Sequence, residues 1–109
     1  MSENQARLFP VERIQSNAGN CWFAPLPPEA GFGDQVDNST ISKLELFEDS
    51  VRIGPAHSLH DKICGDGGGR YSHWGNSLFF SASDNTNPLE NGRSYQMLIP
   101  ASDSVSHLK

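Results

Sequence analysis

From residue 40 onward, apolar and polar positions alternate in short stretches, the pattern of strands that bury one face. The stretch 41–47 alternates through Leu44 and Leu46, and 51–53 alternates again after a polar turn at 48–50. Two short alternating runs separated by a polar turn are typical of a β-hairpin.

Two apolar segments predict further strands nearer the C-terminus. The segment 78–80 is too apolar to be exposed to water and is interpreted as the centre of a strand. In 94–99 every second residue is apolar, so that these residues share one face. The polar loop 83–92 separates the two strands and contains the turn dipeptide Asn91-Gly92.

One segment has helical spacing. Within 56–64, Leu59 and Ile63 lie at i and i+4, and Ser58 is available as an N-cap. The glycine-rich run 65–69 ends this helix.

The first 38 residues lack regular periodicity. Prolines and glycines interrupt them, and the prolines within 20–28 exclude a helix there. We interpret 20–28 as an extended segment whose Trp22 and Phe23 reach into or across a sheet.

The chain of 109 residues is long enough for one domain. We divide it into an irregular N-terminal arm at 1–38 that packs on the domain, a β-rich core at 39–100 and a polar tail at 101–109. Gly, Pro, Ser and Asn supply over a third of all residues, which favours turns and strands over a helical bundle. The expected fold is mainly β: a single small antiparallel β-sandwich or partly open barrel with one short helix.

Charge and hydropathy exclude two classes of partner. Eight Lys and Arg against thirteen Asp and Glu give an acidic protein with a formal net charge of −5, whereas a nucleic-acid binder needs a surplus of positive charge. No apolar run approaches the roughly 18 residues of a membrane-spanning helix. No apolar segment follows the polar start at 1–5, as a secretory signal would require. We therefore expect a cytoplasmic protein that binds neither nucleic acid nor membrane.

The two cysteines, Cys21 and Cys64, are too few for the disulfide framework of a small secreted domain. A disulfide between them is compatible with the sequence but is not indicated by it. We expect two free, partly buried thiols.

The segment 69–76 is the most distinctive in the chain, because it combines a cation, two aromatic rings, a histidine and an amide. Sugar sites are built in this way: an aromatic ring covers the apolar face of a pyranose, and polar side chains bond its hydroxyls. The polar loop 84–93 could supply more of these groups. The candidate ligand-binding residues are Arg70, Tyr71, His73, Trp74, Asn76, Asp84, Asn85 and Arg93.

Metal sites are weakly indicated. His57 and His60 are spaced i, i+3, and His73, Asp61 or Cys64 could complete a zinc site, but no spacing such as C-x-x-C or H-E-x-x-H is present. The oxygen-bearing residues of the polar loop do not fall at EF-hand positions for calcium. We expect no metal and no cofactor.

Nucleophilic catalysis would need a serine beside a base. Ser72 or Ser81 could pair with His73 or His60 and be supported by Asp84, but with fourteen serines such pairs arise by chance. No G-x-S-x-G motif is present. We expect no catalytic residue and no enzymatic activity.

The segments 46–49, 53–60, 69–75, 78–85 and 91–95, taken together and in this order, resemble a small β-rich module of bacteria. This module accompanies glycosyltransferases, methyltransferases and other surface-polysaccharide proteins, and the resemblance spans about residues 40 to 100. It implies a non-catalytic, carbohydrate-linked role and transfers no catalytic residue.

Two functions remain in view, beside the possibility that the segment from Arg70 to Trp74 belongs to the core and the function lies in the N-terminal arm. The first is a carbohydrate-binding or polysaccharide-associated module. The alternative is a small acidic protein-interaction module, such as a phage or mobile-element inhibitor that covers a basic site on a host protein. Its negative charge would steer it to that site, and Arg70, Tyr71 and Trp74 would act as interface anchors.

Overall fold

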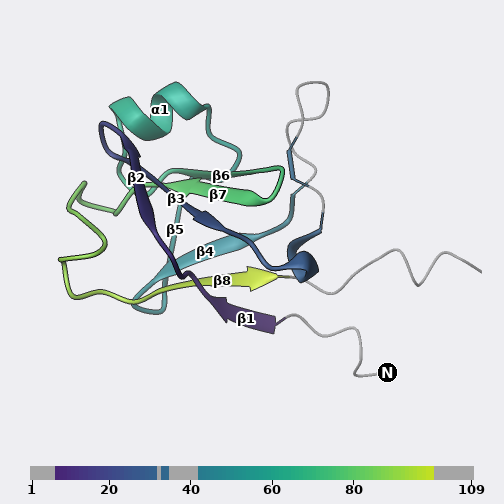
Figure 1. Ribbon diagram of the computed structural model, residues 1–109. Helices are drawn as coiled ribbons and strands as arrows, with labels where there is room; N and C mark the ends of the chain where they lie inside the picture. The colour runs from purple at the N-terminus through teal and green to yellow at the C-terminus, as the bar shows by residue number, and fades with distance from the viewer. Residues whose placement is uncertain (1–6, 32, 35–41, 100–109) are drawn as a thin grey trace, which may run out of the picture.

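Two four-stranded antiparallel sheets form the two layers of the fold (Figure 1). The computed structural model describes residues 7–31, 33–34 and 42–99. Sheet A has the order β1 (Arg7–Pro10), β8 (Tyr95–Ile99), β4 (Glu45–Glu48), β5 (Val51–Ile53). Sheet B has the order β2 (Gln15–Ala18), β3 (Cys21–Pro25), β7 (Ser77–Phe80), β6 (Tyr71–Trp74). The expected β-sandwich with one short α-helix is confirmed.

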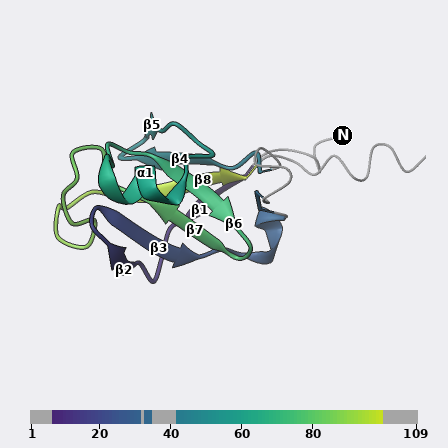
Figure 2. The same cartoon turned by 90° about the horizontal axis from the view of Figure 1, so that it is seen from above.

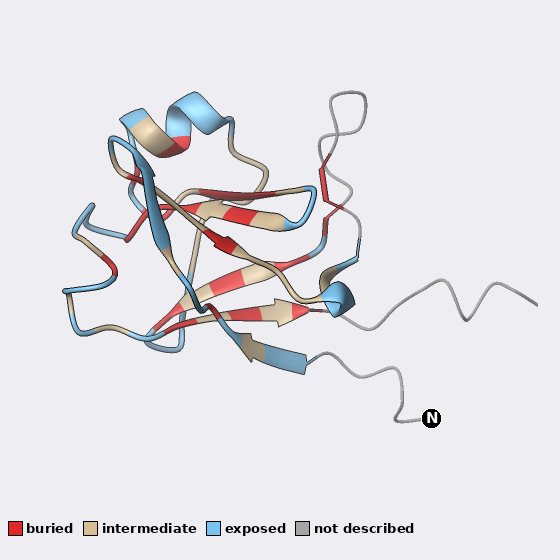
Figure 3. Cartoon of the chain, in the orientation of Figure 1, coloured by how far each residue is buried: buried red, intermediate tan, exposed pale blue. Residues whose placement is uncertain are grey.

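The hydrophobic core lies between the two sheets, where the buried positions of facing strands meet (Figure 3). Phe80 of sheet B and Tyr95 of sheet A join the layers, with ring centroids 5.3 Å apart. Burying aromatic and aliphatic side chains removes apolar surface from water and supplies most of the stabilisation. The fully buried side chains of this core are Ala24, Leu46, Leu78, Phe80, Ala82 and Met97.

Alternation predicts β8 and the hairpin β4–β5, but β4 begins at Glu45 rather than within the first part of the predicted stretch 41–47, and β6 was not predicted as a strand. The hairpin β4–β5 pairs Leu46 with Ile53, and its turn places Asp49 and Ser50 at positive φ. In β8 the predicted face is buried at every second residue, from Tyr95 to Ile99. The loop 83–92 contains neither helix nor strand.

The prediction of an irregular N-terminal arm is wrong for the described part of 1–38. Three strands lie there: β1 pairs with β8, β2 pairs with β3, and β3 pairs with β7 in the middle of sheet B. β1 and β2 are edge strands with mostly exposed side chains. Backbone hydrogen bonds hold them in place, so their sequences need no alternation.

The helix is shorter than predicted. α1 spans His60–Gly65, and Leu59 precedes it without a side-chain cap. Ser58 does not cap the helix: its hydroxyl donates to the carbonyl oxygen of Pro55, and its N–H donates to that of Tyr71, which places this segment along the edge of β6. Of the expected apolar pair, Ile63 is fully buried but Leu59 is 68% exposed.

The expectation of two free thiols is also wrong, because Cys21 and Cys64 form a disulfide. Cys21 opens β3, and Cys64 lies in α1, which packs against β3 and β7. The turn between β2 and β3 meets the end of α1, where Asn20 N–H donates to the carbonyl oxygen of Cys64 over 2.9 Å. Tertiary packing thus joins cysteines that the sequence separates by 43 positions.

Within the described residues, no helix is long and apolar enough to cross a membrane. The predicted polar tail at 101–109 lies outside the described residues.

Candidate functional site

The eight predicted ligand-binding residues do not form one site. Arg70 precedes β6 and Trp74 ends it, so the two lie at opposite ends of a four-residue strand, about 13 Å apart. Tyr71 and His73 alternate with Trp74 and point between the sheets, toward the core. The candidate residues of the segment 69–76 therefore lie at both ends of β6 and on both faces of sheet B.

The side chains of Tyr71 and His73 form hydrogen bonds inside the fold. The hydroxyl of Tyr71 donates to the carbonyl oxygen of Leu44 over 3.0 Å, and burial raises the pKa of this phenol. His73 Nε2 lies 3.1 Å from the carbonyl oxygen of Gly75, which can only accept, so Nε2 carries the proton. Nδ1 then accepts from the hydroxyl of Ser42 over 2.7 Å. Burial lowers the pKa of His73, which favours this neutral imidazole.

Asp84 and Arg93 neutralise each other. The guanidinium makes a bidentate contact with the Asp84 carboxylate, with N–O distances of 2.8 and 2.9 Å. These hydrogen bonds lower the pKa of Asp84 and raise that of Arg93. Arg93 Nη1 also lies 3.5 Å from Glu48, which accepts a 2.6 Å hydrogen bond from the hydroxyl of Tyr95. The cluster attaches the polar loop to sheet A and leaves few free donors for a ligand.

Arg70 and Asn85 stabilise the glycine-rich loop after α1. Gly68 N–H donates to Asn85 Oδ1 over 2.8 Å, and Arg70 Nη1 donates to the carbonyl oxygen of Gly67 over 3.0 Å. Asn85 has a positive φ of 65°, which asparagine tolerates better than most residues. Both side chains are thus used for loop structure.

A buried carboxylate and its histidine partner were missed by the sequence analysis. Asp34 is 2% exposed; its Oδ1 accepts from the N–H of Ser42 over 2.9 Å, and its Oδ2 lies 2.7 Å from Nδ1 of His57. His57 has a positive φ of 58° and lines a cavity of about 250 Å³ together with Lys43 and Arg52. No local pattern in the sequence marks Asp34, because the partners of its carboxylate, Ser42 and His57, come from two separate segments.

The outer face of sheet B carries an aromatic cluster. Phe23 on β3 lies directly opposite Phe79 on β7, with ring centroids 6.0 Å apart. Trp74 on β6 pairs with Ser77, which makes it the diagonal neighbour of Phe79 on the same face, at about 7–8 Å. All three rings are half-buried and belong to neither the core nor its border. We call Phe23, Phe79 and Trp74 the aromatic face.

The helix covers only part of this sheet. Seen from above, α1 lies over one end of sheet B and leaves the end near the β6–β7 turn uncovered (Figure 2). His60 of α1 packs against Phe79 in a T-shaped arrangement, with ring centroids 5.2 Å apart. Gln15 lies opposite Phe23 and Ser77 lies opposite Trp74, so polar groups flank the rings on the same face.

Only Trp74 of the aromatic face was predicted as a site residue. Asn76, also predicted, is exposed in the turn that follows it. The sequence does contain a signal for Phe23 and Phe79. Strand alternation in 22–24 and 78–80 places the middle residue of each stretch on the opposite face of the sheet from its two neighbours.

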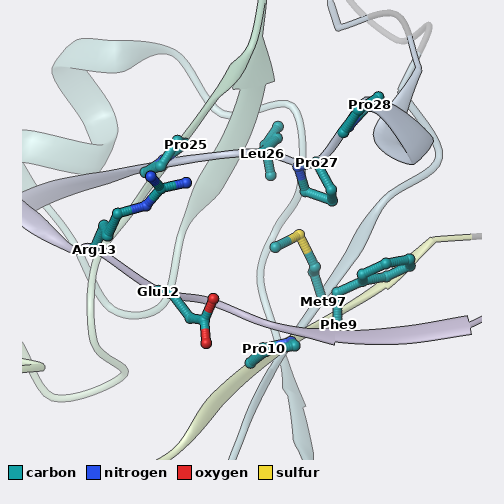
Figure 4. Close-up of a pocket in the computed structure, with 9 residues that line it drawn as sticks. All are labelled: Phe9, Pro10, Glu12, Arg13, Pro25, Leu26, Pro27, Pro28 and Met97. Atoms are coloured by element: carbon teal, nitrogen blue, oxygen red, sulfur yellow. The ribbon is translucent and has the colours of Figure 1, made fainter.

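A second cavity opens between the sheets beside β1 and the end of β3 (Figure 4). Its volume is about 230 Å³, and Met97 points into it from β8. Glu12 and Arg13 lie on one side, and the prolines that follow β3 lie on the other. This cavity suits a small apolar group more than a polar ligand.

Comparison of the chain with protein-family models, curated proteins and solved structures finds no match.

Proposed function

We propose that this protein is a non-catalytic carbohydrate-binding module that holds a glycan on the aromatic face. The observation that carries the proposal is the alignment of Phe23, Phe79 and Trp74 on the partly uncovered outer face of sheet B. Flat aromatic rings cover the apolar C–H faces of sugar rings, and the adjacent Gln15 and Ser77 supply hydrogen bonds to hydroxyls.

The shape of the site supports an extended ligand. The rings lie on three adjacent strands, so the aromatic face is broad, and it suits more than one sugar unit of a chain. Because a sheet face is open to water, each contact must offset the cost of ordering the ligand. We therefore expect weak binding by a single module.

The environment of the nearest serine–histidine pair supports a non-catalytic role. His73 bonds Ser42 rather than Ser72 or Ser81, and Ser42 and His73 are 5% and 1% exposed. Ser42 lines the cavity beside His57, but such low exposure leaves a substrate carbonyl little room at its hydroxyl, which a nucleophile must bring into contact with its substrate.

The disulfide bears on where the protein works. Disulfides persist in oxidising compartments and are rare in the reducing cytoplasm. The Cys21–Cys64 bond therefore favours an oxidising location over the cytoplasmic one expected from the sequence.

A glycan array followed by calorimetric titration tests the proposal. Trp74→Ala is expected to weaken binding of a positive polysaccharide at least about tenfold, the equivalent of 1.4 kcal/mol. The matched control is Phe9→Ala, which removes a half-buried ring from sheet A. Equal losses in both variants would contradict the aromatic face as the site.

Salt dependence separates this function from the acidic protein-interaction module. Binding of a neutral glycan should be nearly insensitive to ionic strength, whereas charge-steered association with a host protein should weaken at high salt. A blank glycan array, together with salt-sensitive capture of one basic host protein, would replace the carbohydrate proposal with the interaction module.

A further inference from the structure

The disulfide has a histidine beside it. The ligand atoms of Cys21, His60 and Cys64 all lie within 4.8 Å of one another. Cys21 is fully buried at the start of β3, Cys64 is half-buried, and His60 is exposed at the start of α1. Within the described chain, this is the one group of three such residues close enough to share a metal ion.

Among the described histidines, His60 is the one whose ring nitrogens are available to bind a metal ion. His57 is bonded to Asp34, and His73 is bonded to Ser42 and Gly75. In the described part of the chain, neither ring nitrogen of His60 has a hydrogen-bond partner, and the ring packs against Phe79 in a T-shaped arrangement. Its position four residues before Cys64 puts both side chains on one face of α1.

Contacts other than the disulfide hold the two cysteines together. Asn20 N–H donates to the carbonyl oxygen of Cys64 over 2.9 Å, and Asn20 Nδ2 donates to that of Gly65 over 3.1 Å. Gly19 approaches so closely that an added Cβ would lie 2.6 Å from the Cys64 carbonyl oxygen. Ile63 is fully buried and fixes the helix on the sheet. The sulfur atoms therefore stay neighbours when the bond between them is broken.

We propose that reduction of the disulfide turns Cys21, Cys64 and His60 into a binding site for Zn²⁺. A thiol or phosphine reductant supplies two electrons, two protons enter, and the sulfur–sulfur bond becomes two thiols. Zinc binding then releases the thiol protons, because the metal is bound by thiolates. The site is therefore closed in the oxidised protein and forms only in the reduced one.

The geometry required by zinc is close to that of the chain. Tetrahedral zinc, with sulfur at about 2.3 Å and nitrogen at about 2.0 Å, needs ligand atoms roughly 3.3–3.8 Å apart. The present spread of at most 4.8 Å requires small side-chain rotations only. Two cysteines and one histidine leave the fourth position to water, as in open zinc sites.

Cobalt titration of the full chain tests the site. In protein reduced with a phosphine under anaerobic conditions, we expect one Co²⁺ per chain, with thiolate charge-transfer absorption and the visible bands of tetrahedral cobalt. Zn²⁺ should displace it. The oxidised protein should show none of these bands, and Cys64→Ser should lose the charge-transfer band.

Two helix variants isolate the role of the histidine. His60→Ala is expected to weaken Co²⁺ binding by at least about tenfold, since even outer partners of metal ligands contribute that much. Asp61→Asn changes the exposed neighbour and should leave the affinity unchanged. Equal affinities of the wild-type and His60→Ala proteins would overturn the three-residue site.

Circular dichroism of the same samples is the control for unfolding of the reduced chain. The reduced chain should keep its native near-ultraviolet signal, or regain it on adding Zn²⁺. A reduced chain that stays unfolded with Zn²⁺, or a folded one without the thiolate band, would contradict the proposal.

Discussion

Trp22 and Trp74 belong to the same sheet but point to opposite faces of it. Trp22 lies opposite Phe80 in the register of β3 and β7 and packs against the core. Trp74 lies opposite Ser77 and points outward, on the side of Phe23 and Phe79. One tryptophan thus contributes to stability, whereas the other is available to a ligand.

This relationship predicts different effects of two similar substitutions. Trp22→Ala should destabilise the fold by about 2–4 kcal/mol, because it leaves a cavity at the border of the core. Trp74→Ala should cost less than about 1 kcal/mol, since the ring borders water. Urea unfolding of both variants measures the difference. A larger loss for Trp74→Ala would show that the outer ring is structural.

The disulfide should contribute strongly to stability. Closing a loop of 43 positions restricts the unfolded chain, and disulfides of this kind stabilise by about 2–4 kcal/mol. A Cys21→Ser, Cys64→Ser double variant should therefore melt lower than the oxidised protein, by roughly 10–25 °C. Calorimetry of the double variant and of the oxidised chain tests this prediction. Unchanged melting would contradict a formed disulfide.

Stability should fall on acidification in two steps. Burial lowers the pKa of His73 below 6.5, so below that value the unfolded chain binds a proton that the folded chain resists. Burial of Glu48 opposes its ionisation, but hydrogen bonds from Ser83 and Tyr95 hold its pKa below 4.5. This carboxylate therefore stabilises the fold above that value and loses its effect as pH falls further.

Urea midpoints at pH 7.5, 5.5 and 3.5 measure this profile. We expect a decrease at each step. A midpoint that stays constant from pH 7.5 to 5.5 would mean that His73 titrates alike in the folded and unfolded chains.

At high pH, ionisation of the Tyr95 hydroxyl should lower the stability of the fold. Burial and the hydrogen bond to Glu48 raise its pKa to about 12. Because the folded state favours the neutral phenol, this contribution is complete below pH 10 and disappears as pH rises toward 12. Tyr95→Phe should make the alkaline loss smaller and leave the part due to the buried Tyr71, which unfolding curves at pH 9 and 11 would reveal. The same alkaline loss in the variant would assign it to another group.

Gly33 should be intolerant of any side chain. A Cβ there would lie 2.7 Å from the carbonyl oxygen of His73 and 2.8 Å from the nitrogen of Gly75, which are backbone atoms that cannot move aside cheaply. Gly33→Ala should destabilise by about 1–3 kcal/mol. The matched control is Gly65→Ala, where an added Cβ meets nothing within 4 Å. Chemical denaturation of the two variants should separate them clearly, and equal stabilities would contradict this close approach.

The sequence predicts those strands that have one buried face and one face closer to solvent. β8 and β4 bury one face, so their alternation is visible. β1 and β2 are exposed edge strands, and their pairing partners, not their own residues, determine their structure.

The candidate site was predictable only in part. Trp74 was identified because its segment is chemically distinctive, but Tyr71 and His73 alternate with it and face the core. The disulfide depends on the turn at Gly19 meeting the end of α1, a tertiary contact that no local pattern encodes.

The most direct test of the account is a glycan titration of the Trp22→Phe variant, in which Trp74 is the one remaining tryptophan. With a polysaccharide that binds the wild-type protein, the emission of Trp74 should shift, and iodide should quench it less as the glycan covers the ring. The converse variant Trp74→Phe should show no shift in the emission of Trp22. Binding that leaves the emission and quenching of Trp74 unchanged would contradict the aromatic face as the carbohydrate site.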